Sequence, residues 1–128
     1  MEEAPIRRLI ERVCSGEDRT IADLSIVLAD HATVRDLNRR YLSHDYETDV
    51  LSFPLGEDEG SGVDGELYID LDTAQERHAE FDGSFEDEVA RYVVHGLLHL
   101  MGYSDASPTE RQLMRAREDR YLEEWRNT

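Results

Sequence analysis

Two histidines, His95 and His99, lie four residues apart in the segment VVHGLLHLMGYSD. If this segment is helical, both imidazoles project from one face of the helix, one turn apart. Gly102 follows, where a residue without a Cβ lets the chain turn back, and Asp105 comes six residues after His99. Three protein ligands leave one open position on a zinc ion, which is typical of a catalytic site, whereas a structural site has four. The motif HxxxHxxGxxD therefore predicts one Zn²⁺ held by His95, His99 and Asp105.

The residue after the first histidine separates two classes of metal-dependent hydrolase. In HExxH metallopeptidases, a glutamate at this position is the general base. This chain has Gly96 there, so a peptidase of that type would lack its base. The bare HxxxH pair has a second interpretation, because a buried helix can also carry two core histidines. The glycine and the aspartate at their spacings favour the metal site.

Three segments together resemble a known family. HGLLHLMGY, Thr48–Pro54 (TDVLSFP) and Gly65–Asp70 (GELYID), in this relative arrangement, are similar to the YbeY family of metal-dependent, single-strand-specific endoribonucleases. The similarity runs over roughly Ala29 to Trp125. It implies an α+β fold, a zinc ion, and action on single-stranded ribosomal RNA near the 3′ end of the small-subunit RNA. Ribosome quality control and contact with components of the small ribosomal subunit are further expectations from the resemblance.

Three positions depart from the family pattern. The family motif usually ends in a third histidine, where this chain has Asp105. Aspartate is a competent zinc ligand, but its charge should make the metal a weaker Lewis acid. The family typically has an arginine where this chain has Leu42, so an expected phosphate-binding cation is missing. Arg40 or Arg39 could replace it. We favour Arg40, although a solvated surface arginine is an equally good interpretation. The third departure is Gly65-Glu66 in place of Gly-Asp.

The length of 128 residues predicts a single domain. With the α+β fold that the resemblance implies, we expect a small mixed sheet covered by helices. Capping residues and apolar periodicity indicate where the helices lie. The expected helices run from Pro5 to Ser15–Gly16, from about Thr33 past Tyr41, from a cap at Asp72 or Thr73, from Ser84 to Met101, and from Ser107 onward. The expected strands are Leu24–Leu28, Thr48–Phe53 and Glu66–Ile69, with exposed loops at Ser43–Glu47 and Gly56–Gly65.

The last expected helix places one carboxylate among apolar residues. Glu118 shares a stripe with Met114, Tyr121 and Trp125. A buried acid needs a partner. Glu118 could orient a metal-bound histidine or act as a general base, or it could simply pair with an arginine.

These features favour a zinc-dependent endoribonuclease, in which the metal activates a water or polarises the scissile phosphate. An alternative of a different class is a ribosome-assembly factor that binds RNA or a ribosomal protein and keeps a purely structural metal. Leu42 and the acidic composition favour this alternative. A metallopeptidase is the least favoured interpretation because of Gly96.

The composition is strongly acidic and free of lysine. Thirty acidic residues stand against 14 basic ones, all arginine, which gives a formal net charge of -16. Such a charge should repel RNA as a whole. No apolar run approaches the roughly 20 residues that a membrane-spanning helix needs, so we expect a soluble, cytoplasmic protein. Cys14 is the only cysteine, which excludes an internal disulfide and a cysteine-based zinc site.

One hypothesis for this composition is adaptation to a saline cytoplasm; the alternative is an acidic, arginine-rich composition without such adaptation. Molar salt shortens the Debye length to about 3 Å, so self-repulsion would fade there. We therefore expect the free energy of unfolding to rise between dilute buffer and molar potassium chloride. Urea titrations at graded salt measure it, and a protein that is most stable in dilute buffer contradicts the hypothesis.

Overall fold

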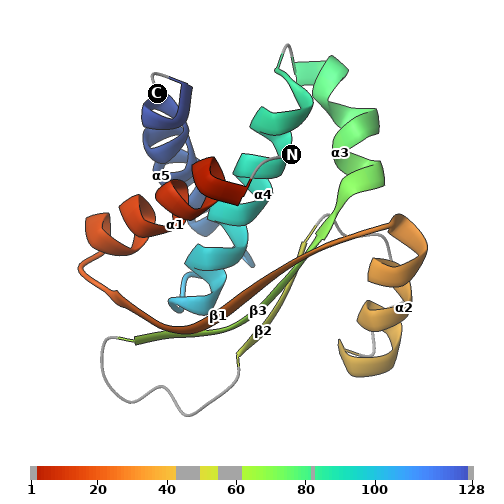
Figure 1. Ribbon diagram of the computed structural model, residues 1–128, viewed down its shortest axis with the longest axis horizontal. Coiled ribbons are helices and arrows are strands. Elements are labelled where there is room, and N and C mark those ends of the chain that lie inside the picture. The colour runs from red at the N-terminus through yellow and green to blue at the C-terminus, as the bar shows by residue number, and fades with distance from the viewer. Residues whose placement is uncertain (1–2, 43–49, 55–61, 82, 127–128) are drawn as a thin grey trace.

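Helices and one three-stranded sheet form the part of the chain that the computed structural model describes, residues 3–42, 50–54, 62–81 and 83–126. The elements are α1 (Glu3–Gly16), β1 (Thr20–Ala29), α2 (His31–Leu42), β2 (Val50–Pro54), β3 (Gly62–Asp70), α3 (Leu71–Arg77), the 3₁₀ turn η1 (His78–Phe81), α4 (Phe85–Leu100) and α5 (Pro108–Arg126). The predicted α+β class is confirmed (Figure 1).

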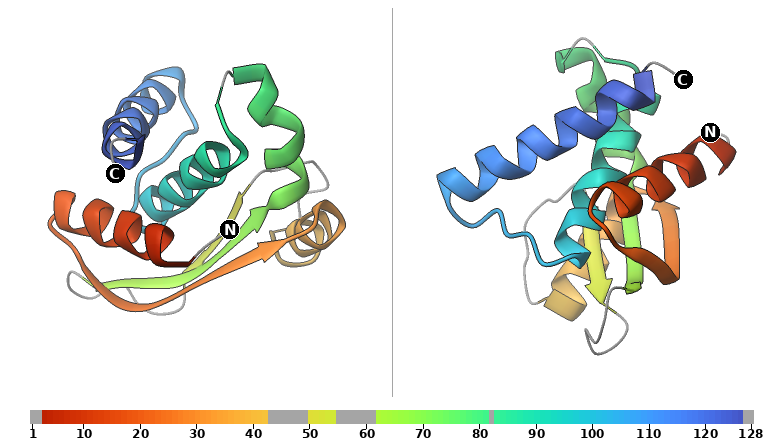
Figure 2. Two further views of the ribbon diagram at one scale, coloured as in Figure 1. Left: turned by 45° about the horizontal axis from the view of Figure 1, so that its top comes forward. Right: turned by 90° about the vertical axis from the view of Figure 1, so that its left-hand side faces the viewer.

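The sheet has the strand order β1-β3-β2 and is mixed, as expected with the fold that the family resemblance implies. β3 lies in the middle, parallel to β1 and antiparallel to β2. Its residues alternate between a buried and a partly exposed face, which is the pattern of a strand covered on one side. Helices α1, α3, α4 and α5 lie on one side of the sheet, and α2 stands at its end (Figures 1 and 2).

Helix α4 is the centre of the molecule. It packs on β2 and β3 below, on α1 and α5 at its sides, and on α3. Its buried residues cover most of its circumference, so its direction and rotation are fixed by packing rather than by propensity. A capping box begins α4: the Ser84 hydroxyl accepts from the Asp87 N–H, and the Asp87 carboxylate accepts from the Ser84 N–H.

The chain leaves α4 through a short loop into α5. Gly102 has φ +101°, the left-handed conformation that glycine adopts without strain. A second capping box begins α5, with the Ser107 hydroxyl accepting from the Glu110 N–H and the Glu110 carboxylate accepting from the Ser107 N–H. The loop between the two helices is therefore short and fixed at both ends.

Several predictions of local structure are wrong. Residues 62–65 belong to β3 and not to a loop, because they pair with the first half of β1, starting at Thr20 with Gly62. This long-range pairing also starts β1 earlier than the expected Leu24. Asp70, and not Asp72 or Thr73, caps α3, since its carboxylate accepts from the Thr73 N–H.

The expected loop Ser43–Glu47, the first residues of the strand expected at Thr48–Phe53, and residues 56–61 of the expected loop lie outside the described residues. Each described helix is too short or too polar to span a bilayer.

Gly65 allows the end of α4 to approach the sheet. A Cβ at this position would lie 2.8 Å from the carbonyl oxygen of Phe53 and 2.8 Å from Cδ2 of Leu100. The Phe53 carbonyl belongs to the β2–β3 pairing and cannot yield as a flexible side chain can. The last turn of α4 carries His99. It can pack this closely on the sheet only because Gly65 has no side chain.

We expect Gly65→Ala to lower the free energy of unfolding by about 1–3 kcal/mol, the usual cost of overpacking. Alanine's lower conformational entropy in the unfolded chain opposes this loss by less than about 1 kcal/mol. Urea denaturation followed by circular dichroism measures the change. Ser25→Ala on the exposed part of β1 is the control and should shift stability by less than about 0.5 kcal/mol. Equal stability of the two variants would contradict the close-approach argument.

Candidate metal centre

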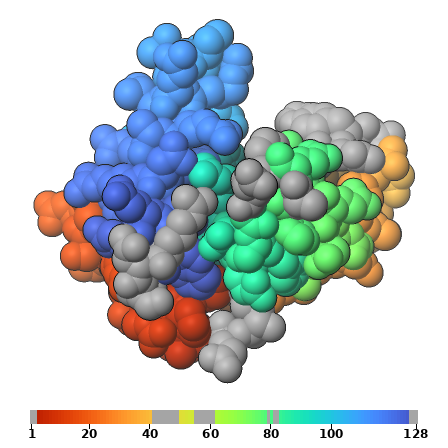
Figure 3. All heavy atoms as spheres, turned by 90° about the horizontal axis from the view of Figure 1, so that it is seen from above, coloured from red at the N-terminus to blue at the C-terminus, as the bar shows by residue number. Residues whose placement is uncertain are grey.

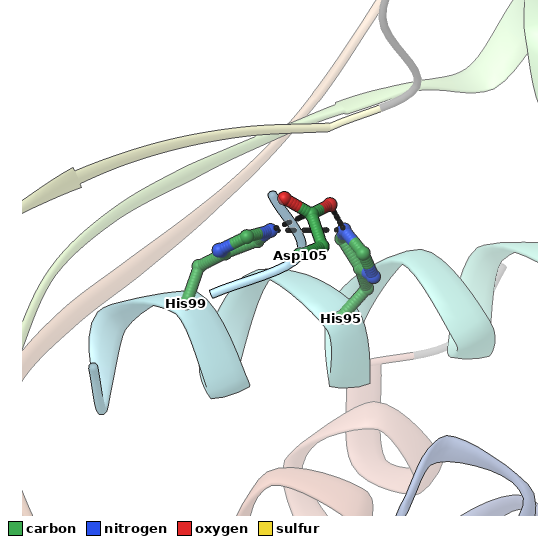
Figure 4. A group of neighbouring side chains, drawn as sticks. All are labelled: His95, His99 and Asp105. Carbon is green, nitrogen blue, oxygen red and sulfur yellow. Dashed lines mark hydrogen bonds and ion pairs between the residues drawn. The ribbon is translucent and has the colours of Figure 1, made fainter. Parts of the chain in front are cut away.

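The structure brings the three predicted ligand side chains together. His95 and His99 project from one face of α4, and the loop before α5 carries the Asp105 carboxylate over them (Figure 4). The two Nε2 atoms are 3.0 Å apart, and each lies 3.4 Å from Oδ2 of Asp105. The side chains are 25%, 28% and 44% exposed for His95, His99 and Asp105. The cluster is therefore open to solvent on one side.

The hydrogen bonds at the far side of each ring decide which nitrogen carries a proton. Nδ1 of His95 lies 2.7 Å from Oε2 of Glu118, and Nδ1 of His99 lies 3.0 Å from the carbonyl oxygen of Tyr103. A carboxylate and a carbonyl only accept, so both Nδ1 atoms donate. In a neutral ring, Nε2 then holds a lone pair. Two lone pairs and a carboxylate oxygen converge on one point, which is an arrangement that a cation stabilises.

The spacing of the three atoms fits a metal ion. Nitrogen and oxygen ligands lie about 2.0–2.1 Å from zinc, and tetrahedral angles then separate two ligand atoms by about 3.3–3.4 Å. Two of the three separations match this value and the third, 3.0 Å, is slightly shorter. His95, His99 and Asp105 thus form a group that could hold a metal ion. Three ligands leave room for a further one from solvent or substrate.

A network of charged groups contacts His95 at Nδ1, the ring nitrogen that points away from the cluster. Glu118 is 5% exposed, as its apolar stripe predicts. Its Oε2 accepts from His95, and its Oε1 accepts from Arg91 at 2.9 Å. Arg91 also donates to Asp119 at 2.8 Å. Burial would lower the pKa of Arg91, but the two carboxylates outweigh it and raise that pKa. Two of the three roles weighed for Glu118, contact with a histidine and pairing with an arginine, are therefore present at once.

His99 is held through Tyr103, which belongs to the loop after α4. While the Tyr103 carbonyl accepts from His99, its hydroxyl donates to Oε1 of Glu17 at 2.6 Å. Glu17, directly after α1, also accepts from Arg117 at 3.0 and 3.1 Å and from the Tyr121 hydroxyl. Only 6% of the Glu17 side chain is exposed. The orientation of His99 thus depends on a carboxylate at the other end of the sequence.

The carboxylate position of Asp105 is fixed through its backbone. Arg111, in the first turns of α5, donates from one nitrogen to the carbonyl oxygens of Asp105 at 3.2 Å and Ala106 at 3.4 Å. Sequence reasoning did not single out Arg111, Arg91, Tyr103 or Glu17. Among these four residues, only Arg111 had a local signal in the sequence, since a basic residue stands six positions after Asp105.

Beside the cluster lies a cavity of about 360 Å³ between α4, α5 and the end of α3. His95 and Asp105 form part of its wall. Four arginines and four carboxylates line it, so their charges cancel although the chain is strongly acidic: Arg77, Arg91, Arg111 and Arg115 with Asp87, Glu88, Asp105 and Glu118. Arg40, the expected phosphate-binding residue, is not part of this wall; it pairs with Asp36 on α2 and is 67% exposed.

Comparison with known proteins extends the similarity beyond these motifs. The family model described as Endoribonuclease YbeY matches residues 1–126. A Salinibacter ruber protein named endoribonuclease YbeY is 54% identical over 95% of this chain and 82% of its own length. A protein of the same name from Chlorobium luteolum is 40% identical over 97% and 89% of the two chains.

A solved structure agrees with the fold. The solution structure of a protein from Thermotoga maritima superimposes with a TM-score of 0.65 at 29% identity, covering 94% of this chain and 78% of that one. The similarity therefore includes α1, which lies before the segments that first suggested a family.

We expect Glu17→Gln to destabilise the protein by about 2–3 kcal/mol at pH 7, because the amide nitrogen cannot accept from the donors that surround it. Burial would raise the pKa of Glu17, but hydrogen bonds from Tyr103 and Tyr121 and the charge of Arg117 hold it below its usual 4.5. A lowered folded-state pKa contributes stability above pH 4.5 that is lost as the pH falls through the folded value. The gap between the two proteins should therefore shrink in acid.

The zinc affinity of Glu17→Gln tests the same link a second time. Competition with a chromophoric chelator measures it. Loosening of Tyr103 and His99 should weaken binding by about tenfold, as the loss of groups behind a ligand does. Glu11→Gln, on an exposed position of α1, is the matched control and should change neither quantity. If Glu17→Gln behaves like this control at every pH, the link from α1 to His99 does not operate.

Proposed function

Because the chain belongs to the endoribonuclease YbeY family, we propose that it is a metal-dependent endoribonuclease that cleaves single-stranded RNA. The observation that carries this proposal is the convergence of three ligand atoms with one side open. A site of three protein ligands is typical of catalytic zinc. We assign the activity to residues 1–128 as a single domain.

The residues of the chain orient the site. Glu118 and the Tyr103 carbonyl keep the ring protons of the two histidines on Nδ1 and leave both Nε2 atoms as ligands for the ion. The bound ion supplies Lewis acidity towards a phosphate and towards water. Glu118 orients His95 in this proposal instead of acting as the general base, because His95 and Arg91 already engage both of its oxygens.

We propose zinc as the ion, since two imidazoles and a carboxylate are a ligand set that zinc accepts. Asp105 stands where the resembling family usually has histidine. Its carboxylate reduces the net charge of the loaded site and with it the acidity of bound water. We therefore expect the pH at half-maximal activity of this chain to rise above that of its Asp105→His variant.

The proposed substrate is ribosomal RNA near the 3′ end of the small-subunit RNA, with small-subunit components as partners and the cytoplasm as the location. Support for this choice comes from the family resemblance. Arg40 as the cation that contacts the phosphate stays a prediction. Arg111 and Arg115 are better placed, because they line the cavity that contains His95 and Asp105.

A ribosome-assembly factor with a structural metal is the second candidate, favoured by the net charge of -16. The two candidates differ in what the metal does. A structural ion contributes folding free energy, whereas a catalytic ion can be lost while the fold remains.

We expect Asp105→Ala to keep the helical circular dichroism spectrum and most of its thermal stability while cleavage of single-stranded RNA falls by more than about 100-fold. The expected loss is larger than the roughly 10- to 100-fold that follows removal of a group that only supports a ligand. Glu123→Ala, exposed on α5, should cleave normally. If Asp105→Ala unfolds the protein, or if chelation unfolds the parent chain, the structural-metal candidate is favoured. Proteolysis of an unfolded casein-like substrate with added zinc would revive the peptidase interpretation.

A further inference from the structure

Glu88 is a buried carboxylate that the proposed chemistry does not use. It lies on α4 seven residues before His95, on the same face of the helix, and lines the same cavity. Only 8% of its surface is exposed. Its side chain makes no hydrogen bond or ion pair with any residue in the described part of the chain. The neighbouring Glu118, by contrast, is engaged at both oxygens.

The Glu88 oxygens are not among the buried unpartnered atoms of the described residues, so solvent in the cavity reaches them. A ligand that displaces this solvent must supply donors in its place, because a carboxylate left without them would lose free energy. Because Glu88 lines the cavity and no described residue donates to its side chain, a ligand that fits it carries at least one, and preferably two adjacent, N–H or O–H groups. A carboxylate that accepts two parallel hydrogen bonds gives direction as well as affinity.

Donors for an anion lie at the other end of the cavity. Arg115 lines it and makes no ion pair among the residues that the structure describes. Arg111 uses one nitrogen for two backbone carbonyls, and a guanidinium has five N–H groups. The contacts of α4 with α5, such as His95 with Glu118, show that the helices run antiparallel. Arg111 therefore lies towards Asp105, and Glu88 lies at the far end.

Seen from the helical side of the molecule, α4 is exposed between α5 and α3 (Figure 3). A volume of about 360 Å³ is within the range of small-ligand sites and accommodates one nucleotide. Glu88 and His95 are separated along α4 by about 10 Å at 1.5 Å per residue. This is similar to the reach from a phosphate to the pairing edge of its own base.

Among the RNA bases, guanine matches the carboxylate best. Its N1–H and exocyclic amino group point the same way and can both donate to one carboxylate. Adenine and cytosine offer only the amino group, and the N3–H of uracil is flanked by two carbonyls that a carboxylate repels. Proteins read unstacked single-stranded bases on this edge.

We propose that this cavity binds a guanosine nucleotide next to the scissile phosphate, with Glu88 accepting from the base and Arg111 and Arg115 contacting the phosphate. This inference rests on the proposed endoribonuclease function. It makes Glu88 a specificity-determining residue and gives the enzyme a preference for bonds beside guanosine.

The test uses zinc-loaded protein and single-stranded oligonucleotides that contain one guanosine in a row of other bases. Inosine, which lacks the exocyclic amino group, replaces that guanosine in a second set. We expect cleavage beside guanosine to exceed cleavage beside inosine by about tenfold, a typical loss for half of a bidentate contact. Glu88→Gln should cut both at the inosine rate. Glu86→Gln, exposed on α4, should keep the preference.

Binding of guanosine and inosine 5′-monophosphates, followed by calorimetry, separates this inference from the proposed activity. Tighter binding of the guanosine nucleotide, lost in Glu88→Gln and weakened about tenfold in Arg115→Ala, supports the site even if no RNA is cleaved. Cleavage without any difference between guanosine and inosine, in the parent chain, overturns the site and leaves the activity standing. The comparison of the two bases on the parent chain needs no variant to fold.

Discussion

The site depends on two imidazoles whose lone pairs point at each other from 3.0 Å. Left alone, two Nε2 lone pairs and the Asp105 carboxylate repel each other. They are held together because each Nδ1 proton is fixed on an acceptor, Glu118 for His95 and the Tyr103 carbonyl for His99. The fold thus fixes the three groups in an arrangement that is favourable only around a positive charge.

That arrangement is held from parts of the chain that are far apart in sequence. Arg91 and Glu118 join α4 to α5 behind His95, and Glu17 joins the end of α1 to Tyr103 behind His99. Each junction is a largely buried carboxylate that receives charge-assisted hydrogen bonds, which are stronger than neutral ones. Groups behind a metal ligand fix its orientation, and losing one typically costs about 10- to 100-fold in metal affinity or activity.

The sequence predicts what local rules determine. The four-residue spacing of His95 and His99, the glycine after them and the two capping boxes specify α4, the loop and α5, and all are present. Contacts between distant segments follow no local rule. Tyr103 and Glu17 are 86 residues apart, and the start of β3 at Gly62 arises from pairing with β1. A glycine-rich acidic segment gives no local sign of a strand.

The strongly acidic composition of the chain does not extend to the wall of the cavity beside the site. Opposite charges cancel in the wall of the cavity beside His95, where four of the 14 arginines gather. A divalent ion bound at the neighbouring tripod would add positive charge to this region, in a chain with a formal net charge of -16. RNA would then be attracted to this region, while the net charge of the chain repels it. Because salt screens the distant repulsion more strongly than a close contact, rising ionic strength should weaken RNA binding by this protein less than binding by a basic nuclease.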